Sequence, residues 1–323
     1  MRRIAIYLLC IFMLLPVATM TAQPGYNYSK LQREKLNRGV VAIRENPSEV
    51  IVSWRYLSSD PIQTGFNVYR DGKKLTDTPI TVSTLFRDKN NSQKTAVYEV
   101  RPVLKGKETH HIDGTYTLPE NAPLGYLEIP LQKPADGITP AGDTYTYSPN
   151  DASIGDVDGD GEYEIILKWD PSNSHDNAHE GYTGEVYIDC YRMNGEQLWR
   201  INLGKNIRAG AHYTQFMVYD LDGDGKAEVV MKTADGTVDG TGKVIGDAQA
   251  DYRNEQGRIL TGPEYLTVFN GLTGEAMQTI DYVPVRGDLM GWGDSRGNRS
   301  DRFLACVAYL DGIHPSVVMC RGY

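Results

Sequence analysis

The feature that most constrains this chain is a repeated acidic segment. Residues 152–168 and residues 216–232 share one order: an apolar run, an Asp-x-Asp-Gly-Asp-Gly turn and a second apolar run. The two turns begin at Asp156 and at Asp220, which lies 64 positions later. Self-similarity over a period of this length indicates that the chain is built from stacked copies of one structural unit.

Each copy is followed by two further apolar stretches joined by a glycine-containing turn. These stretches are residues 186–193 with 196–201, and residues 265–270 with 275–280. Four strands form one unit, and a single unit cannot bury both of its faces alone. This pattern predicts the blades of a β-propeller.

The sequence contains two such units and the beginning of a third, which runs from Phe303 to Tyr323. Propeller rings typically contain about 4–8 blades. An open ring would expose a strand edge and apolar surface to water. We therefore expect the chain to be the N-terminal fragment of a longer protein, truncated within a propeller domain that begins at residue 144.

The two acidic turns carry the ligand chemistry of a calcium site. Carboxylates occupy positions 1, 3, 5 and 9 of each turn, and the main-chain carbonyl at position 7 supplies a further oxygen. The predicted metal-binding residues are Asp156, Asp158, Asp160, Glu162 (carbonyl) and Glu164, followed by Asp220, Asp222, Asp224, Lys226 (carbonyl) and Glu228. Ca²⁺ takes about 6–8 oxygen ligands, and four crowded carboxylates repel one another without a cation. The predicted cofactor is therefore Ca²⁺.

Two other interpretations of these turns are possible. A single Asp/Gly turn could simply be a solvated connection between strands, but two copies in register favour metal binding. An EF-hand is disfavoured because its acidic ligand stands at position 12 and its loop joins two helices. Here the last Glu stands at position 9, and strand-like runs flank both turns.

The first 143 residues have a different pattern. Residues 4–17 form an apolar run within residues 1–22, which is typical of a secretory signal peptide and too short for the roughly 20 residues of a membrane span. Residues 30–130 contain short alternating strands and predict an all-β sandwich of the fibronectin type III-like kind. Residues 131–143 are rich in Pro, Gly and Ala and predict a linker. Export would bring the protein to the periplasm, the cell surface or the medium.

The net charge of the chain limits the partners that it could bind. The formal net charge is −9, and it becomes −11 once Arg2 and Arg3 leave with the signal peptide. Such a chain repels nucleic acid and anionic membranes, and it repels acidic polysaccharides unless cations intervene.

Three cysteines, Cys190, Cys306 and Cys320, remain after export. Their odd number and their strand-like surroundings predict small core residues and no disulfide framework.

Five segments give a more specific indication. They are residues 150–156, 168–174, 204–216, 250–258 and 292–295. With these segments and the doubled acidic turns, the chain from about residue 40 onward resembles the rhamnogalacturonan lyases of polysaccharide lyase family eleven. The resemblance implies an eight-bladed propeller with several Ca²⁺ ions. It also implies cleavage of the rhamnose–galacturonate backbone of rhamnogalacturonan I, a pectin, by β-elimination.

The resemblance places Asn150 and Asp170 among the substrate contacts. It also implies that the catalytic Arg and Lys come from later blades, to which nothing in this sequence corresponds. No catalytic residue is therefore named, and the fragment alone is expected to show no efficient turnover. The local basic residues, each more typical of a structural role, are Lys168, Arg208, His212, Lys232 and Arg286.

Two other functions fit the same pattern. A calcium-stabilised propeller could be a non-catalytic glycan-binding or adhesion module, which needs no Arg/Lys pair in its groove. A glycoside hydrolase would need two acidic residues about 5–10 Å apart and free of metal, whereas the conspicuous carboxylates here are assigned to Ca²⁺. We predict a lyase that acts as an exported monomer on an acidic polysaccharide.

Overall fold

The computed structural model describes residues 30–109 and 114–323 and consists mainly of β-strands, which confirms the all-β prediction. The predicted signal peptide lies outside the described residues. A 3-10 helix, η2 (Leu289–Trp292), interrupts the strands near the C-terminal end. Within the two described ranges, no helix has the length and the apolar character that a membrane crossing requires.

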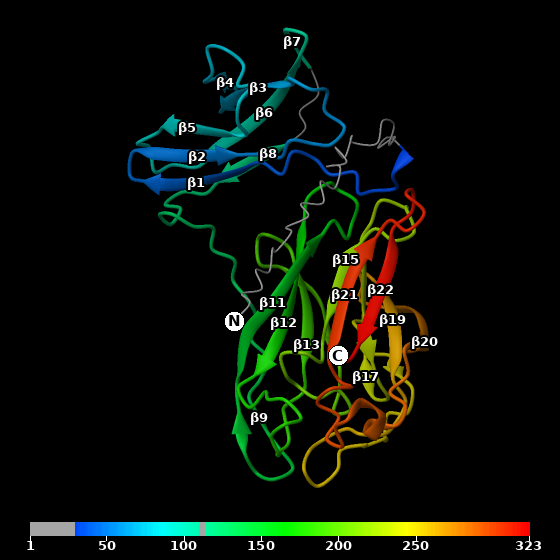
Figure 1. The fold of residues 1–323 in the computed structure, drawn as a ribbon. Coiled ribbons are helices and arrows are strands. Elements are labelled where there is room, and N and C mark those ends of the chain that lie inside the picture. The colour runs from blue at the N-terminus through cyan, green and yellow to red at the C-terminus, as the bar shows by residue number, and fades with distance from the viewer. Residues whose placement is uncertain (1–29, 110–113) are drawn as a thin grey trace, which may run out of the picture.

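Two sheets formed by the first hundred or so residues lie together at the top of Figure 1. One contains β1 (Val41–Asn46), β2 (Glu49–Ser53) and β5 (Leu85–Lys89). The other contains β3 (Gly65–Arg70), β4 (Lys73–Lys74), β6 (Ala96–Leu104), β7 (Lys107–Glu108) and β8 (Thr115–Leu118). Alternate residues of both sheets, such as Val50, Val52, Val68 and Val100, enclose one core around the buried Trp54.

The rest of the chain forms the longer body below these sheets in Figure 1. Its first sheet contains β11 (Tyr147–Gly155), β12 (Glu164–Pro171), β13 (Tyr187–Tyr191), β14 (Gln197–Asn202), β17 (Thr237–Val238) and β18 (Val244–Ile245). The second contains β15 (Phe216–Tyr219), β16 (Glu228–Thr233), β19 (Tyr265–Asn270) and β20 (Ala276–Asp281). The third pairs β21 (Phe303–Ala308) with β22 (Ser316–Arg321), and a small sheet pairs β9 (Gly137–Ile138) with β10 (Thr144–Tyr145).

The predicted repeat is visible in the order of these strands. Each repeat contributes four neighbouring antiparallel strands, which are β11 to β14 in the first and β15, β16, β19 and β20 in the second. In both sheets an acidic turn joins the first strand to the second. The first strands lie next to one another, with β11 beside β15 and β15 beside β21. Corresponding strands of successive units are therefore stacked.

The two larger sheets share a hydrophobic core. Ile166 and Ile188 of the first sheet and Val229 and Phe269 of the second belong to one buried cluster. Close approach of the sheets depends on Gly155, where an added Cβ would lie 2.5 Å from a methyl carbon of Val218. A side chain at this position would push the sheets apart.

Several details differ from the expected pattern. The hairpin β17–β18 extends the first sheet beyond four strands, because Val238 pairs with Asn202. β9 lies within the segment predicted as a linker. Cys190 is buried as expected, but Cys306 and Cys320 are exposed, so the prediction that they are core residues was wrong. Alternation in a two-stranded sheet does not show which face is covered.

An extended segment before β1 crosses the acidic turns and connects the upper sheets to the body. The amide of Asn37 donates to the carbonyl of Gly161 at 2.9 Å, and the amide of Gln32 donates to the carbonyl of Ile313 at 2.8 Å. The Arg55 guanidinium lies 4.0 Å from the centre of the Tyr163 ring. These contacts fix the upper sheets beside the first acidic turn.

Candidate metal centres and substrate pocket

The sequence of the first acidic turn dictates its curled shape. Gly159 and Gly161 adopt φ angles of +83° and +89°, which other residues adopt only with strain. The carboxylate of Asp156 accepts hydrogen bonds from both glycine amides, at 2.7 Å and 2.8 Å. The carboxylate of Glu164 accepts one from the amide of Val157 at 3.0 Å. Asp156 and Glu164 thus hold the turn from its two ends.

The second turn repeats these contacts. The Asp220 carboxylate accepts from the amides of Gly223 at 2.7 Å and Gly225 at 3.1 Å. The Glu228 carboxylate accepts from the amide of Leu221 at 2.8 Å. Two copies of one sequence therefore fold into two copies of one geometry, as the internal repeat predicts.

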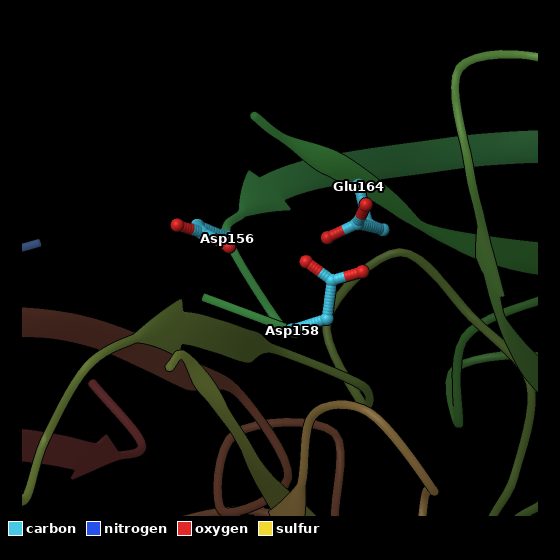
Figure 2. Close-up of side chains that lie close together, drawn as sticks. All are labelled: Asp156, Asp158 and Glu164. Carbon is cyan, nitrogen blue, oxygen red and sulfur yellow. The ribbon is translucent and has the colours of Figure 1, made fainter. Parts of the chain in front are cut away.

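Three carboxylates gather at each turn. They are Asp156, Asp158 and Glu164 in the first, and Asp220, Asp222 and Glu228 in the second, and in each group one oxygen per residue lies within 4.8 Å of the others. Figure 2 shows the first group at the turn between β11 and β12, with the carboxylates of Asp158 and Glu164 facing each other. These six of the predicted metal-binding residues are brought together by the structure.

The remaining predicted ligands lie differently. The Asp160 carboxylate accepts from the amide of Glu162 at 2.7 Å, and the Asp224 carboxylate accepts from the amide of Lys226 at 2.8 Å. Asp160 and Asp224 thus close the ends of their turns and stand outside the gathered groups. The main-chain oxygens of Glu162 and Lys226 remain predicted ligands.

Burial makes both groups electrostatically unfavourable by themselves. The pKa of Glu164 rises to about 7, first because the side chain is buried and then because Asp158 and Asp160 lie nearby. Burial and the neighbouring aspartates also raise the pKa of Glu228 to about 7. Burial likewise raises the pKa values of Asp156 and Asp220.

The donor atoms suit a hard divalent cation. Each group offers carboxylate oxygens, which Ca²⁺ prefers, and the charge of a cation would offset both the burial and the mutual repulsion. Each group of three carboxylates is therefore able to bind a metal ion.

A separate depression of about 480 Å³ lies beside β11 and β12 and contains the two predicted substrate contacts. The pairing of these strands shifts between Pro149 and Ala152, so a bulge turns Asn150 and Asp151 outward. Asp170, near the end of β12, lies on the same wall. Bulges of this kind reorient side chains beside functional sites.

Polar atoms without partners mark this depression. Oδ1 of Asp170 is buried and has no hydrogen-bond partner, and burial raises the pKa of this carboxyl. His175 also lines the depression; its Nδ1 lies 2.6 Å from the carbonyl oxygen of Asn173, and its Nε2 is buried without a partner. Because buried polar groups are rarely left unpaired, these atoms are available to a polar ligand.

Lys168 is the cation of the depression. Its stem is buried, with the side chain 2% exposed, and its Nζ lies 2.7 Å from a carboxylate oxygen of Asp151, whose side chain is 62% exposed. Lys232 occupies the same place in the second repeat, but its Nζ is 3.0 Å from the buried Glu264. Of these two equivalent lysines, Lys168 therefore has the partner that is easier to displace.

The other basic candidates have structural partners. Arg208 is buried and donates to main-chain carbonyls, among them that of Gly181 at 3.0 Å. Arg286 lies 2.9 Å from Glu264, and Nε2 of His212 lies 3.8 Å from Asp176. The expectation that these three residues serve the structure is consistent with these contacts.

The sequence did not predict a substrate-site role for three residues of the depression, namely Asp151, His175 and His179. His175, His179 and His212 could form a transition-metal cluster, but their irregular spacing in the sequence suits no zinc motif. The one available signal was the unusual Pro-Asn-Asp stretch in an otherwise regular strand, because proline in a strand indicates an edge or a bulge.

Two family models match the chain. One is described as rhamnogalacturonan lyase family 11, C-terminal domain, and matches residues 126–323. The other is described as rhamnogalacturonan I lyases beta-sheet domain and matches residues 31–117. Together they cover most of the described residues.

Similar proteins and structures agree with these matches. The chain is 63% identical over 294 residues to the rhamnogalacturonan exolyase YesX of Bacillus subtilis (strain 168), covering 91% of this chain and 47% of that protein. It is 61% identical over 292 residues to the rhamnogalacturonan endolyase YesW of the same strain, covering 90% and 46%. The crystal structure of YesW superimposes with a TM-score of 0.85 at 60% identity, covering 91% of this chain and 49% of that chain. The chain spans about half the length of the curated relatives it matches.

Proposed function

The chain belongs to rhamnogalacturonan lyase family 11, and we propose that the protein that carries it is a calcium-dependent lyase of the rhamnogalacturonan I backbone. The observation that carries this proposal is the identity above 60% to two named rhamnogalacturonan lyases across nine-tenths of the chain. Because those relatives are about twice as long as the matched region, the activity is attributed to the whole protein.

The proposed architecture has two domains joined by a linker. Residues 30–130 form a fibronectin type III-like β-sandwich, residues 131–143 a linker, and residues 144–323 the first blades of an eight-bladed calcium-binding propeller. The stacking of β11, β15 and β21 supports successive blades, because the first strands of propeller blades line a common axis. The separate family matches to residues 31–117 and 126–323 are consistent with this division.

The proposed cofactor is Ca²⁺, held by the two acidic turns with additional oxygens from the carbonyls of Glu162 and Lys226. Bound Ca²⁺ would supply positive charge at the corner between the first and second strands of each sheet. The amide of Ala227 in the second turn donates to the carbonyl of Asp156 in the first at 2.7 Å, so the two centres are mechanically linked. Their proposed role is to hold neighbouring sheets together.

The depression beside β11 is the proposed substrate site within this chain. Asn150 and Asp170 would hydrogen-bond sugar hydroxyls, since carboxylate and amide oxygens accept from hydroxyl groups and the amide nitrogen donates to them. In β-elimination a base removes the proton from C5 of galacturonate, the C4–O4 bond breaks, a C4–C5 double bond forms, and the departing oxygen takes up a proton. The residues that perform these steps are not assigned within this chain.

The proposed setting is outside the cytoplasm, where an exported monomer would meet a plant polysaccharide. The proposal of export rests on the apolar run in residues 4–17. Bridging cations would explain how an exported chain of net charge −11, after loss of Arg2 and Arg3 from the −9 of the full sequence, could hold a polyanion.

The test is an assay of the whole protein on rhamnogalacturonan I. Unsaturated oligosaccharides, detected by their ultraviolet absorbance, are expected with Ca²⁺ and not after chelation. The lengths of the products distinguish an exolyase from an endolyase. Binding of the polymer without cleavage would contradict the proposal and favour a glycan-binding or adhesion module instead.

A further inference from the structure

The two acidic turns differ in the residue that lies opposite their last glutamate in the neighbouring strand. Arg192 extends from the end of β13 towards the first turn, where its Nη1 lies 2.7 Å from a carboxylate oxygen of Asp158 and 3.6 Å from one of Glu164. Both carboxylates belong to the group gathered at this turn. A fixed positive charge therefore already lies against two of the three gathered carboxylates.

The second turn has no such charge at the equivalent place. β13 pairs with β12 so that Tyr191 is opposite Ile165, and Arg192 therefore stands opposite Glu164. In the second sheet the residue opposite Glu228 is Asn270. Its side-chain oxygen accepts from the amides of Leu272 and Thr273, so it folds back on its own turn.

The motif and the main-chain hydrogen bonds of the two turns are alike. Both contain the same Asp-x-Asp-Gly-Asp-Gly order, gather the same three carboxylates and hold them with equivalent main-chain hydrogen bonds. The first carboxylates, Asp156 and Asp220, are both buried, with 1% of their surface exposed. The second aspartates differ in exposure, since Asp158 is half-buried and Asp222 is exposed, and position 7 is Glu162 in the first turn and the exposed Lys226 in the second. The cation in direct contact with gathered carboxylates is Arg192.

We infer that the two centres bind Ca²⁺ with unequal affinity, and that Arg192 makes the first the weaker one. A Ca²⁺ ion about 2.3–2.6 Å from the oxygens of Asp158 and Glu164 would stand close to the guanidinium. Like charges at that distance repel, and an oxygen that accepts from Arg192 offers less electron density to a cation. The inference rests on the proposed role of Ca²⁺ at both turns.

The consequence is an order of occupancy. As Ca²⁺ rises, the second turn fills first and the first turn follows. The segment before β1 contacts both turns, through Asn37 to Gly161 in the first and through Gln32 to Leu221 in the second. Arg55, which follows β2 of the upper sheets, contacts the first turn at Gly161 and Tyr163. The weaker centre therefore lies where the upper sheets meet the body.

The experiment is a calorimetric Ca²⁺ titration of the chain, with reciprocal exchanges of the two residues. The wild-type chain should show two sites whose dissociation constants differ about tenfold, a difference of about 1.4 kcal/mol. Arg192→Asn should tighten the weaker site towards the stronger one. Asn270→Arg should weaken the stronger site. Arg192→Lys, which keeps the charge, should leave the two sites unequal.

Assignment of the sites uses one further pair of variants. Glu164→Gln should remove the weaker site, and Glu228→Gln should remove the stronger site. Circular dichroism of each variant checks that the strands are retained. Equal affinities in the wild-type chain, or an Arg192→Asn variant with unchanged affinities, would overturn the inference and leave the lyase proposal intact. Absence of any Ca²⁺ binding would overturn both.

Discussion

Without metal, the two acidic turns should make the chain more stable at mildly acidic pH than at neutral pH. Glu164 and Glu228 have pKa values raised from 4.5 to about 7, chiefly by burial. A carboxyl whose pKa is higher in the folded state binds its proton more tightly there. Its contribution to stability is full below the unfolded value of 4.5 and is lost as the pH rises through about 7.

The magnitude follows from these two values. Between about pH 5 and pH 7, each carboxyl should lose about 2 kcal/mol of its contribution, so the pair should lose about 4 kcal/mol. For a protein of this size that corresponds to a melting temperature lower by about 10 °C at the higher pH. Asp156 and Asp220, whose pKa values are also raised by burial, add to the effect in the same direction.

The assay is thermal unfolding of the chelator-treated chain at the two pH values, followed by circular dichroism. A chain in which both glutamates are replaced, Glu164→Gln with Glu228→Gln, is the matched control and should lose most of the pH dependence. Excess Ca²⁺ should reverse the sign, because a cation competes with protons for the same oxygens. Equal or lower stability of the metal-free chain at pH 5 would refute the reasoning.

Three further outcomes are expected. Asp189→Asn should cost about 3–5 kcal/mol in a denaturant titration, because the buried carboxylate accepts from Trp169 at 2.6 Å and pairs with Arg200 at 2.7 Å. Burial opposes ionisation of Glu264, but nearby cations lower its pKa from 4.5 to about 2. This carboxylate therefore contributes stability above pH 4.5 that is lost towards pH 2. Glu264→Gln should remove this acid-dependent loss in unfolding curves. Asp170→Asn should weaken oligosaccharide binding about tenfold or more in calorimetry. The melting temperature should not fall, because Oδ1 of Asp170 has no protein partner. An unchanged affinity would exclude Asp170 from the substrate site.

Much of the fold could be predicted because the repeat is explicit in the sequence. Apolar stretches located strands such as β14 and β19, and the acidic turns marked the corner between the first two strands of each unit. The same turns predicted the carboxylates that gather into two groups, although Asp160 and Asp224 stand outside these groups. The sequence pattern was sufficient to predict features formed by residues that lie close together in the sequence.

Contacts between distant segments could not be predicted. The pairing of β17 with β14 joins segments about 36 residues apart, and no periodicity encodes it. Arg192 reaches the first acidic turn only because β13 pairs with β12 in one particular register. The exposure of Cys306 and Cys320 depends on which face of the third sheet is covered, which alternation alone does not determine.

The most direct test of the central claim is the number of Ca²⁺ ions bound per chain at saturation, measured by equilibrium dialysis and atomic emission. Two ions are expected from the acidic turns, falling to one in Glu164→Gln and one in Glu228→Gln. A chain that keeps its strands and binds no Ca²⁺, or a chain whose Ca²⁺ content is unchanged in both variants, would contradict the assignment of these turns as metal centres.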